Sequence, residues 1–377
     1  MPSLVTSEER SAALTAFAQT RSGREKPGRY WKIDLESLTP DVRADGVAGS
    51  VTIETAPSRA IAVNLEIAAR DHALLLGRAF RSAIEPQNKF AHLALAHAGL
   101  GAFVYVPADC ALDDPIVVRY HAAANETIFP YTVVLAERGA RVTVIERLEL
   151  GSDAFACGVA EIVTEESADV TYASAQFAPD NARVLFTRAA RPGRDARVAW
   201  ANAELGGALS VSDVTVTIAQ PGVDANIATL FFPTGSQHVD VVSNIDHRVG
   251  DATSDTLVKS AAAGRGQGRF VGNIRISANA QHSDAALRDD ALLLSEGAHI
   301  DSVPALEIAA NDVKAYHGAT VGALDQDSIF YMTSRGLERA QAERMIALGF
   351  FEPAIDRFPT EALRDELRAA LQAKVAP

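Results

Sequence analysis

A short motif that recurs at nearly constant spacing constrains the fold of this chain more than any other feature. A small or polar residue followed by an apolar β-former occurs in GARVTV, SADVTY, DARVAW and DANIAT, whose matching apolar positions are Val142, Val170, Val198 and Ile227. The steps between these positions are 28, 28 and 29 residues. A fixed period in this range is typical of a solenoid, in which each repeat buries its apolar side chains against the neighbouring repeats.

The residues within each repeat indicate strands rather than helices. Short β-branched runs such as VTVIERL, RVLFTRA and GNIRISA alternate with Gly, Asp, Asn and Pro from about Gly101 to Phe330, without a helical period of useful length. We therefore expect a mainly β protein built on a parallel β-helix. A large β-sandwich is the alternative, against which the irregular loops and the lack of an Asn-Gly hairpin turn argue.

Helical patterns precede and follow this β region. Before it, we expect a helix over residues 7–20 with Ser7 as its N-cap, and a second helix over 88–98. After it, Thr360 is the expected N-cap of a helix with one apolar face, formed by Leu363, Leu367 and Leu371. The predicted domains are a mostly helical N-terminal domain, a β-helix core and a C-terminal helical domain, covering residues 1–100, 101–330 and 331–377.

Charge and composition exclude several functional classes for this chain of 377 residues. Its formal charge is −13, from 35 basic and 48 acidic side chains, so we expect no nucleic-acid binding, which depends on cationic surfaces. No apolar run approaches the roughly 20 residues that span a bilayer, and the N-terminus lacks the basic and apolar regions of a signal peptide. We therefore expect a cytoplasmic protein without membrane contact.

The two cysteines, Cys110 and Cys157, exclude a disulfide scaffold and an all-cysteine metal site made by one chain. Both are predicted to be small semi-buried residues, with a sulfur-handling role as the alternative. Motifs for a P-loop, a zincin and a nucleophile elbow are absent from the sequence. The glycine-rich segment Gly264–Gly268 has no helix pattern after it, so we expect a turn between repeats rather than a phosphate-binding loop.

The densest polar segment, residues 269–320, begins a series of short motifs that continues to Gly336. The series comprises Phe270, Gly272 and Ile274, then Ala280-Gln281, Asp284-Ala285, Leu292 to Ser295, Pro304 to Lys314, His317 to Gly322, Phe330-Tyr331 and Ser334 to Gly336. In order and spacing it resembles the core signature of the SufB/SufD family of iron–sulfur cluster assembly proteins, and the resemblance extends from about residue 255 to 352. Val106-Pro107 and Trp31-Lys32 extend it weakly upstream.

The resemblance implies a right-handed parallel β-helix between helical segments. It also implies a complex in which SufB and SufD pair through their β-helices, the nascent cluster forms at their interface, and the SufC ATPase docks on the C-terminal helical region. In SufB-type motifs a cysteine stands two residues before the His-Gly, where this chain has Ala315. An alanine can neither accept sulfur nor bind iron, so the chain is most similar to SufD. A homodimer of the isolated chain is left open.

His317 is the predicted metal-contacting residue, because the resemblance places it at the SufB–SufD interface and a neutral imidazole binds iron. A locally hydrogen-bonded surface histidine is the alternative. Two further pairs, His282 with Asp284 and His299 with Asp301, would each lie on one face of a strand and could assist in binding iron.

The resemblance also predicts that partner contacts lie in the C-terminal segment, at Arg335, Gly336, Met345, Phe350 and Phe351. Ordinary packing against the last repeat is the alternative. The predicted function is that of a scaffold and not of an enzyme. It would share a nascent cluster or iron with a partner subunit and bind no cofactor tightly alone. The competing hypotheses are an architectural adaptor without a metal role, and a carbohydrate-active β-helix enzyme using Asp284, Asp289 and Asp290.

Overall fold

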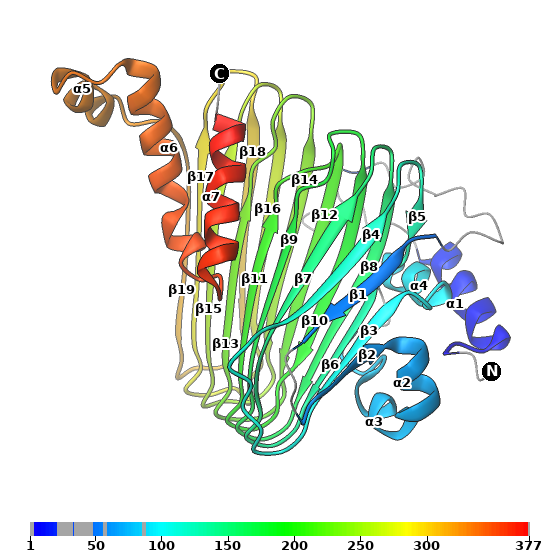
Figure 1. The fold of residues 1–377 in the computed structure, drawn as a ribbon. Helices are drawn as coiled ribbons and strands as arrows, with labels where there is room; N and C mark the ends of the chain where they lie inside the picture. The colour runs from blue at the N-terminus through cyan, green and yellow to red at the C-terminus, as the bar shows by residue number, and fades with distance from the viewer. Residues whose placement is uncertain (1–3, 21–32, 34–47, 56–58, 85–87, 376–377) are drawn as a thin grey trace.

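The structure is a computed structural model that describes residues 4–20, 33, 48–55, 59–84 and 88–375 (Figure 1). Within these residues the strands form two long sheets, and the chain crosses between them at almost every strand. Each sheet contains eight parallel strands along its length and one antiparallel strand at the N-terminal end, and the second sheet has the short parallel strand β5 in addition. The eight turns confirm the predicted parallel β-helix, and the alternative of a β-sandwich is wrong.

The bounds of the strands follow the spatial order of the sheets. The first sheet contains β1 (Ser50–Glu54), β4 (Ile116–Ala122), β7 (Arg141–Leu150), β9 (Asp169–Gln176), β11 (Arg197–Glu204), β13 (Asp224–Phe231), β15 (Thr253–Ala262), β17 (Asp284–Leu293) and β19 (Lys314–Ala323). The second sheet contains β18 (His299–Ile308), β16 (Gln267–Ile276), β14 (His238–His247), β12 (Leu209–Ile218), β10 (Arg183–Arg191), β8 (Phe155–Thr164), β6 (Tyr131–Ala136), β3 (Gly101–Val106) and β2 (Ile61–Asn64), with β5 (Thr127–Ile128) beside β8.

The register of the strands confirms part of the predicted repeat. Val142 pairs with Val170, and Val170 pairs with Val198. Val198, however, pairs with Ala225, so the third step is 27 residues and the assignment of Ile227 to this position is wrong. Ala225 and Ile227 are both buried and lie two residues apart on the same strand face, so the apolar pattern cannot distinguish them.

A ladder of turns holds successive repeats together along one side of the solenoid. The residue at its centre has a positive φ in each turn, and its N–H donates a hydrogen bond to a carbonyl of the next turn, with N–O distances between 2.6 and 3.0 Å. Small or polar residues suit this left-handed conformation. The ladder consists of Asp109, Gly139, Ser167, Asp195, Gly222, Asp251 and His282. The segment Gly264–Gly268 begins with the predicted turn, at residues 264–266, and its last two residues start β16.

The interior between the sheets is mainly apolar, but one inward-facing position of the first sheet carries mostly polar side chains. At one inward-facing position, successive strands from β7 to β17 carry Glu146, Ser174, Asn202, Thr229, Val258 and Asp289. We call this set the polar column. Its members are all buried, and the guanidinium of Arg188 reaches it from β10 in the second sheet.

The N-terminal helices are α1 (Ser7–Gln19), α2 (Leu65–Asp71), α3 (Ala73–Ala79) and α4 (Lys89–Ala96). The N-cap of α1 is Thr6 and not Ser7: Thr6 Oγ1 accepts from the N–H of Glu9 at 3.1 Å, and the Glu9 carboxylate accepts from the N–H of Thr6 at 2.8 Å. Buried residues of α2, α3 and α4 pack with outward-facing residues of the second sheet. The same hundred residues also supply β1 and β2, which the helical pattern does not predict.

The C-terminal helices are α5 (Gln326–Ser334), α6 (Arg339–Ile355) and α7 (Glu361–Val375), so the helical segment begins before residue 331. The Thr360 hydroxyl accepts from the N–H of Leu363 at 3.3 Å, and the apolar face of α7 is buried as predicted. α6 and α7 pack on the outer face of the first sheet, whereas α5 projects beyond it (Figure 1). Among the described residues, no helix is long and apolar enough to cross a membrane.

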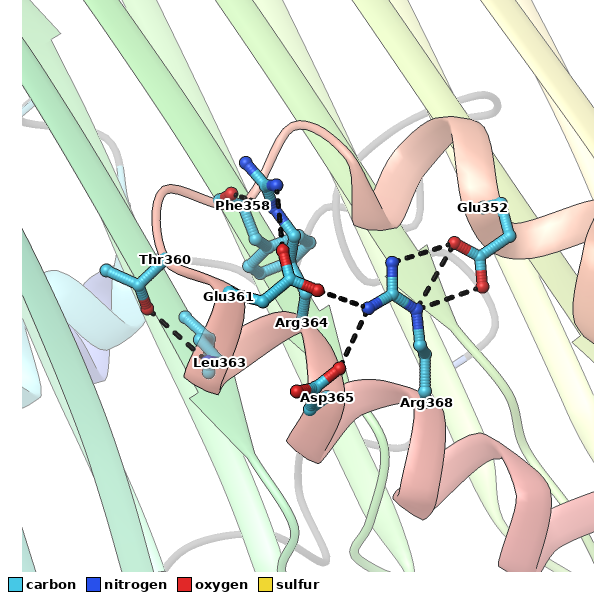
Figure 2. A network of polar contacts seen from close by, with 8 residues as sticks. All are labelled: Glu352, Phe358, Thr360, Glu361, Leu363, Arg364, Asp365 and Arg368. Carbon is cyan, nitrogen blue, oxygen red and sulfur yellow. Dashed lines mark hydrogen bonds and ion pairs between the residues drawn. The ribbon is translucent and has the colours of Figure 1, made fainter.

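A network of charged side chains fixes α6 against α7 (Figure 2). The guanidinium of Arg368 lies 3.1 Å from the Glu352 carboxylate on α6, and 2.8 and 2.9 Å from the Glu361 and Asp365 carboxylates on α7. Because these groups are partly exposed, the network contributes orientation more than stability.

His247 makes the stability of the solenoid dependent on pH. Its ring is buried between the sheets, with Nε2 2.9 Å from Ser254 Oγ, and burial lowers the pKa of His247 to about 4. The unfolded chain binds this proton near pH 6.5, so it holds more protons than the folded chain between these values. We expect stability to fall by roughly 3 kcal/mol as the pH falls from 6.5 to 4.

Urea unfolding of the parent chain and of His247→Gln across this pH range measures how much His247 contributes to the pH dependence of the free energy of unfolding. The carboxylates titrate alike in both proteins. The difference between the two slopes of unfolding free energy against pH therefore reports on the histidine. Equal slopes would contradict the prediction.

Candidate functional site

The solenoid ends at β18 and β19, whose outer edges pair with no strand among the described residues. Their unpaired N–H and C=O groups form a template for a further strand. Large apolar side chains are exposed on the same two strands: Ile308 is 42%, Tyr316 56% and Val321 42% exposed. We call these two strands the open end, and their free edges and exposed apolar side chains make it a candidate interface.

His317 lies on β19, at the open end. It pairs with Leu287 of β17, which is buried between the sheets, so the imidazole lies on the inward face of its strand. It is nevertheless exposed, because no further turn covers it. Within the described part of the chain, no hydrogen bond or ion pair involves its side chain. The alternative of a locally hydrogen-bonded histidine therefore finds no support.

The structure separates the two predicted His–Asp pairs. His299 Nε2 lies 2.9 Å from Asp301 Oδ1, and both residues belong to β18, as expected. The prediction that His282 and Asp284 share a strand face is wrong, because His282 lies in the ladder of turns. There its ring nitrogens lie 3.1 Å from Asp251 Oδ1 and 3.2 Å from Asp312 Oδ2. This histidine therefore links consecutive turns of the ladder.

Both cysteines are buried, more completely than the predicted semi-buried positions. Cys110 packs in the apolar interior, and the Cys157 thiol lies 3.5 Å from the carbonyl of Phe90. Burial raises the pKa of Cys157 far above its ordinary value, so its reactive thiolate is not formed at neutral pH.

The acidic residues of β17 do not form a close pair of carboxylates: Asp284 and Asp290 share the outward face but are separated by six residues, roughly 20 Å along the strand. Asp284 is exposed at the start of the strand, and Asp290 faces outward, with its carboxylate 2.8 Å from Lys259 Nζ. Asp289 faces inward and is completely buried, and it accepts a hydrogen bond from Ser302 of β18. Burial raises the pKa of Asp289 to about 7. Within the described residues, no group of three His, Cys, Asp or Glu side chains could hold a metal ion.

A second exposed surface is formed by α5 and the adjoining part of α6. Phe330 is 74% exposed, Tyr331 59% and Met345 50%, and the Arg335 guanidinium lies 5.1 Å from the centre of the Tyr331 ring. Gly336 follows with φ +94°, a conformation that favours glycine and ends the helix. We call these five residues the α5 surface. Phe330 and Tyr331 belong to the recognised motif, but nothing in the sequence indicates their exposure.

The two adjacent phenylalanines of α6 have different environments. Phe350 is half-buried, with Lys259 Nζ 4.5 Å from the centre of its ring. Phe351 is completely buried and stacks on Phe232 at a ring distance of 5.9 Å. The prediction that Phe351 is an exposed partner-binding aromatic is therefore wrong, because it anchors α6 to the first sheet.

Comparisons with known proteins identify relatives over most of the chain. The family model described as SUF system FeS cluster assembly, SufBD core domain, matches residues 119–350. The chain is 27% identical to the iron-sulfur cluster assembly protein SufD of Bacillus subtilis over 353 residues, which is 91% of this chain and 80% of that protein. SufBD family proteins of Mycobacterium leprae and Staphylococcus epidermidis are 27% and 25% identical over 73% of this chain, which corresponds to 32% and 60% of their own lengths.

Proposed function

Because this chain belongs to the SufBD family of iron–sulfur cluster assembly proteins, we propose that it is a SufD-like scaffold subunit. In this function it performs no catalysis alone. It pairs with a SufB-type subunit in the cytoplasm and contributes one side of the interface where the cluster forms. The cluster or its iron is the cargo of the complex.

The observation that carries this proposal is the position of His317 on the open end. An exposed imidazole without a partner in the described chain is available to iron, and the strands around it can pair with strands of a second subunit. A single imidazole cannot hold a cluster, so the remaining ligands must come from the partner. Ala315 lies beside it, partly buried, where a SufB-type chain carries a thiol.

The α5 surface supports the second contact, with a SufC-type ATPase. Its two exposed aromatic rings lie on α5, which projects beyond the outer face of the first sheet (Figure 1), and its exposed methionine lies on the adjoining helix α6. Exposed aromatic, methionine and arginine side chains are typical of interface centres. Phe351 is excluded from this contact because it is buried.

An architectural adaptor is the second candidate function. The lack of a three-ligand metal group among the described residues favours it. In an adaptor, all ligands of the cluster would lie on the partner, and His317 would be dispensable.

Co-expression with the SufB-type and SufC-type proteins of the same organism tests the proposal. We expect a three-component complex, and His317→Ala should lower its iron and sulfide content more than two-fold without changing its stoichiometry. His121→Ala, which removes an exposed histidine of β4 near the other end of the first sheet, is the matched control and should have no effect. Unchanged iron and sulfide in His317→Ala would establish the adaptor, and failure to form any complex would contradict the proposed partners.

A further inference from the structure

Asp289 is the one member of the polar column next to the open end. Its carboxylate is completely buried, and Oδ2 accepts the hydrogen bond from Ser302. Oδ1 has no hydrogen-bond partner in the described structure. Lys259 of the adjacent strand β15 binds the neighbouring Asp290 on the opposite face of the sheet. A buried carboxylate with an unpaired oxygen is unfavourable unless a cation or donor reaches it in the functional state.

The register places this carboxylate close to His317. Asp289 of β17 pairs with Ala319 of β19, and His317 precedes Ala319 by two residues. With strands about 4.8 Å apart and a rise of about 3.3 Å per residue, the Cα atoms of Asp289 and His317 are separated by roughly 8 Å. Both side chains lie on the inward face, so they can converge on one ion.

At this end, Asp289 pairs with Ala319 of the terminal strand β19 and contacts Ser302 of β18. Ala319 is exposed and carries a methyl group, and Ser302 is half-exposed on the terminal strand β18. A cation that enters at the open end therefore has a short path to Oδ1, past side chains that require little displacement.

We propose that Asp289 is a second iron ligand of this chain, binding ferrous iron through Oδ1 together with the imidazole of His317. The inference rests on the proposed function, which supplies the metal role of His317. Carboxylate and imidazole together are a donor set that ferrous iron accepts, with open positions for other ligands. Here the partner subunit would fill those positions, in agreement with the lack of a third ligand among the described residues.

Anaerobic titration of the metal-stripped complex with ferrous iron tests this inference. Asp289→Asn preserves the shape of the side chain and its contact with Ser302, and we expect it to weaken iron binding at least ten-fold. Asp290→Asn is the matched control, because it removes the adjacent carboxylate from the outward face, and it should change the affinity less than two-fold. Size-exclusion chromatography verifies that each complex remains assembled.

Ala319→Leu provides a second variant that does not alter the buried carboxylate. The position is exposed, so the larger side chain should be accommodated while it covers the path to Oδ1. We expect a similar loss of iron affinity, and an unchanged affinity in this variant would overturn the inference even if Asp289→Asn did not fold. If Asp289→Asn bound iron normally while His317→Ala bound it weakly, only the role of Asp289 would be refuted, and the proposed function would stand. Normal binding in both would refute the proposed function as well.

Discussion

Replacing Arg188 by methionine is expected to lower the free energy of unfolding by about 3–5 kcal/mol, because it breaks a buried ion pair. The guanidinium is completely buried and donates to Glu204 at 3.2 Å, to Ser212 at 2.7 Å and to Ser174 at 2.6 Å. Methionine has a similar length but provides no donor. The Glu204 carboxylate would then remain buried with only the Ser210 hydroxyl at 3.0 Å to stabilise its charge.

Urea denaturation measures this loss, and two further variants identify its cause. In Arg188→Met with Glu204→Gln, the uncompensated charge is removed, so part of the stability should return. Arg197→Met, which breaks the partly exposed pairs with Asp169 and Asp224, should cost less than about 1 kcal/mol. A loss below 1 kcal/mol in Arg188→Met would show that water or neighbouring groups satisfy Glu204.

The second large effect is expected from Phe351→Ala, which removes the aromatic anchor of α6. A buried phenylalanine replaced by alanine typically costs about 3–5 kcal/mol, through lost burial and the cavity that remains. Phe351 stacks on Phe232, so the loss should concentrate at the contact between the C-terminal helices and the first sheet. We expect faster proteolysis of α6 and α7 while the solenoid stays folded.

Phe350→Ala is the matched control for this experiment, because it removes the same side chain from a half-buried position one residue earlier. It should cost less, and proteolysis should change little. Equal protease resistance in Phe351→Ala and the parent chain would show that other contacts of α7 suffice to hold the helices.

The solenoid could be predicted from the sequence because the spacing of apolar residues equals the length of one repeat. The register could not be predicted beyond Val198, because Ala225 and Ile227 both satisfy the apolar pattern. The faces of α6 were equally undetermined. Phe350 and Phe351 are adjacent in sequence, and only the contact with Phe232, on a distant part of the chain, decides which of them is buried.

Part of the candidate site could likewise be predicted from the sequence, and part could not. The motif around His317 is continuous in sequence, so the residue could be identified by resemblance before the structure was known. Asp289 could be seen only as one acidic residue among several, because its burial and its unpaired oxygen depend on the stacking of β17 between β15 and β19. His282 was misassigned for a related reason, since its left-handed conformation arises from the neighbouring turns of the ladder.

The two ends of the solenoid differ, and this difference limits how many chains can associate. At the N-terminal end, the short strands β1 and β2 run antiparallel to the eight turns, whereas at the other end β18 and β19 are full-length and parallel. A molecule with full-length edges at both ends could add copies head to tail into a filament. Among the described residues, this chain has full-length parallel edges, β18 and β19, at one end only, so a subunit paired there would leave no second long parallel edge for head-to-tail addition.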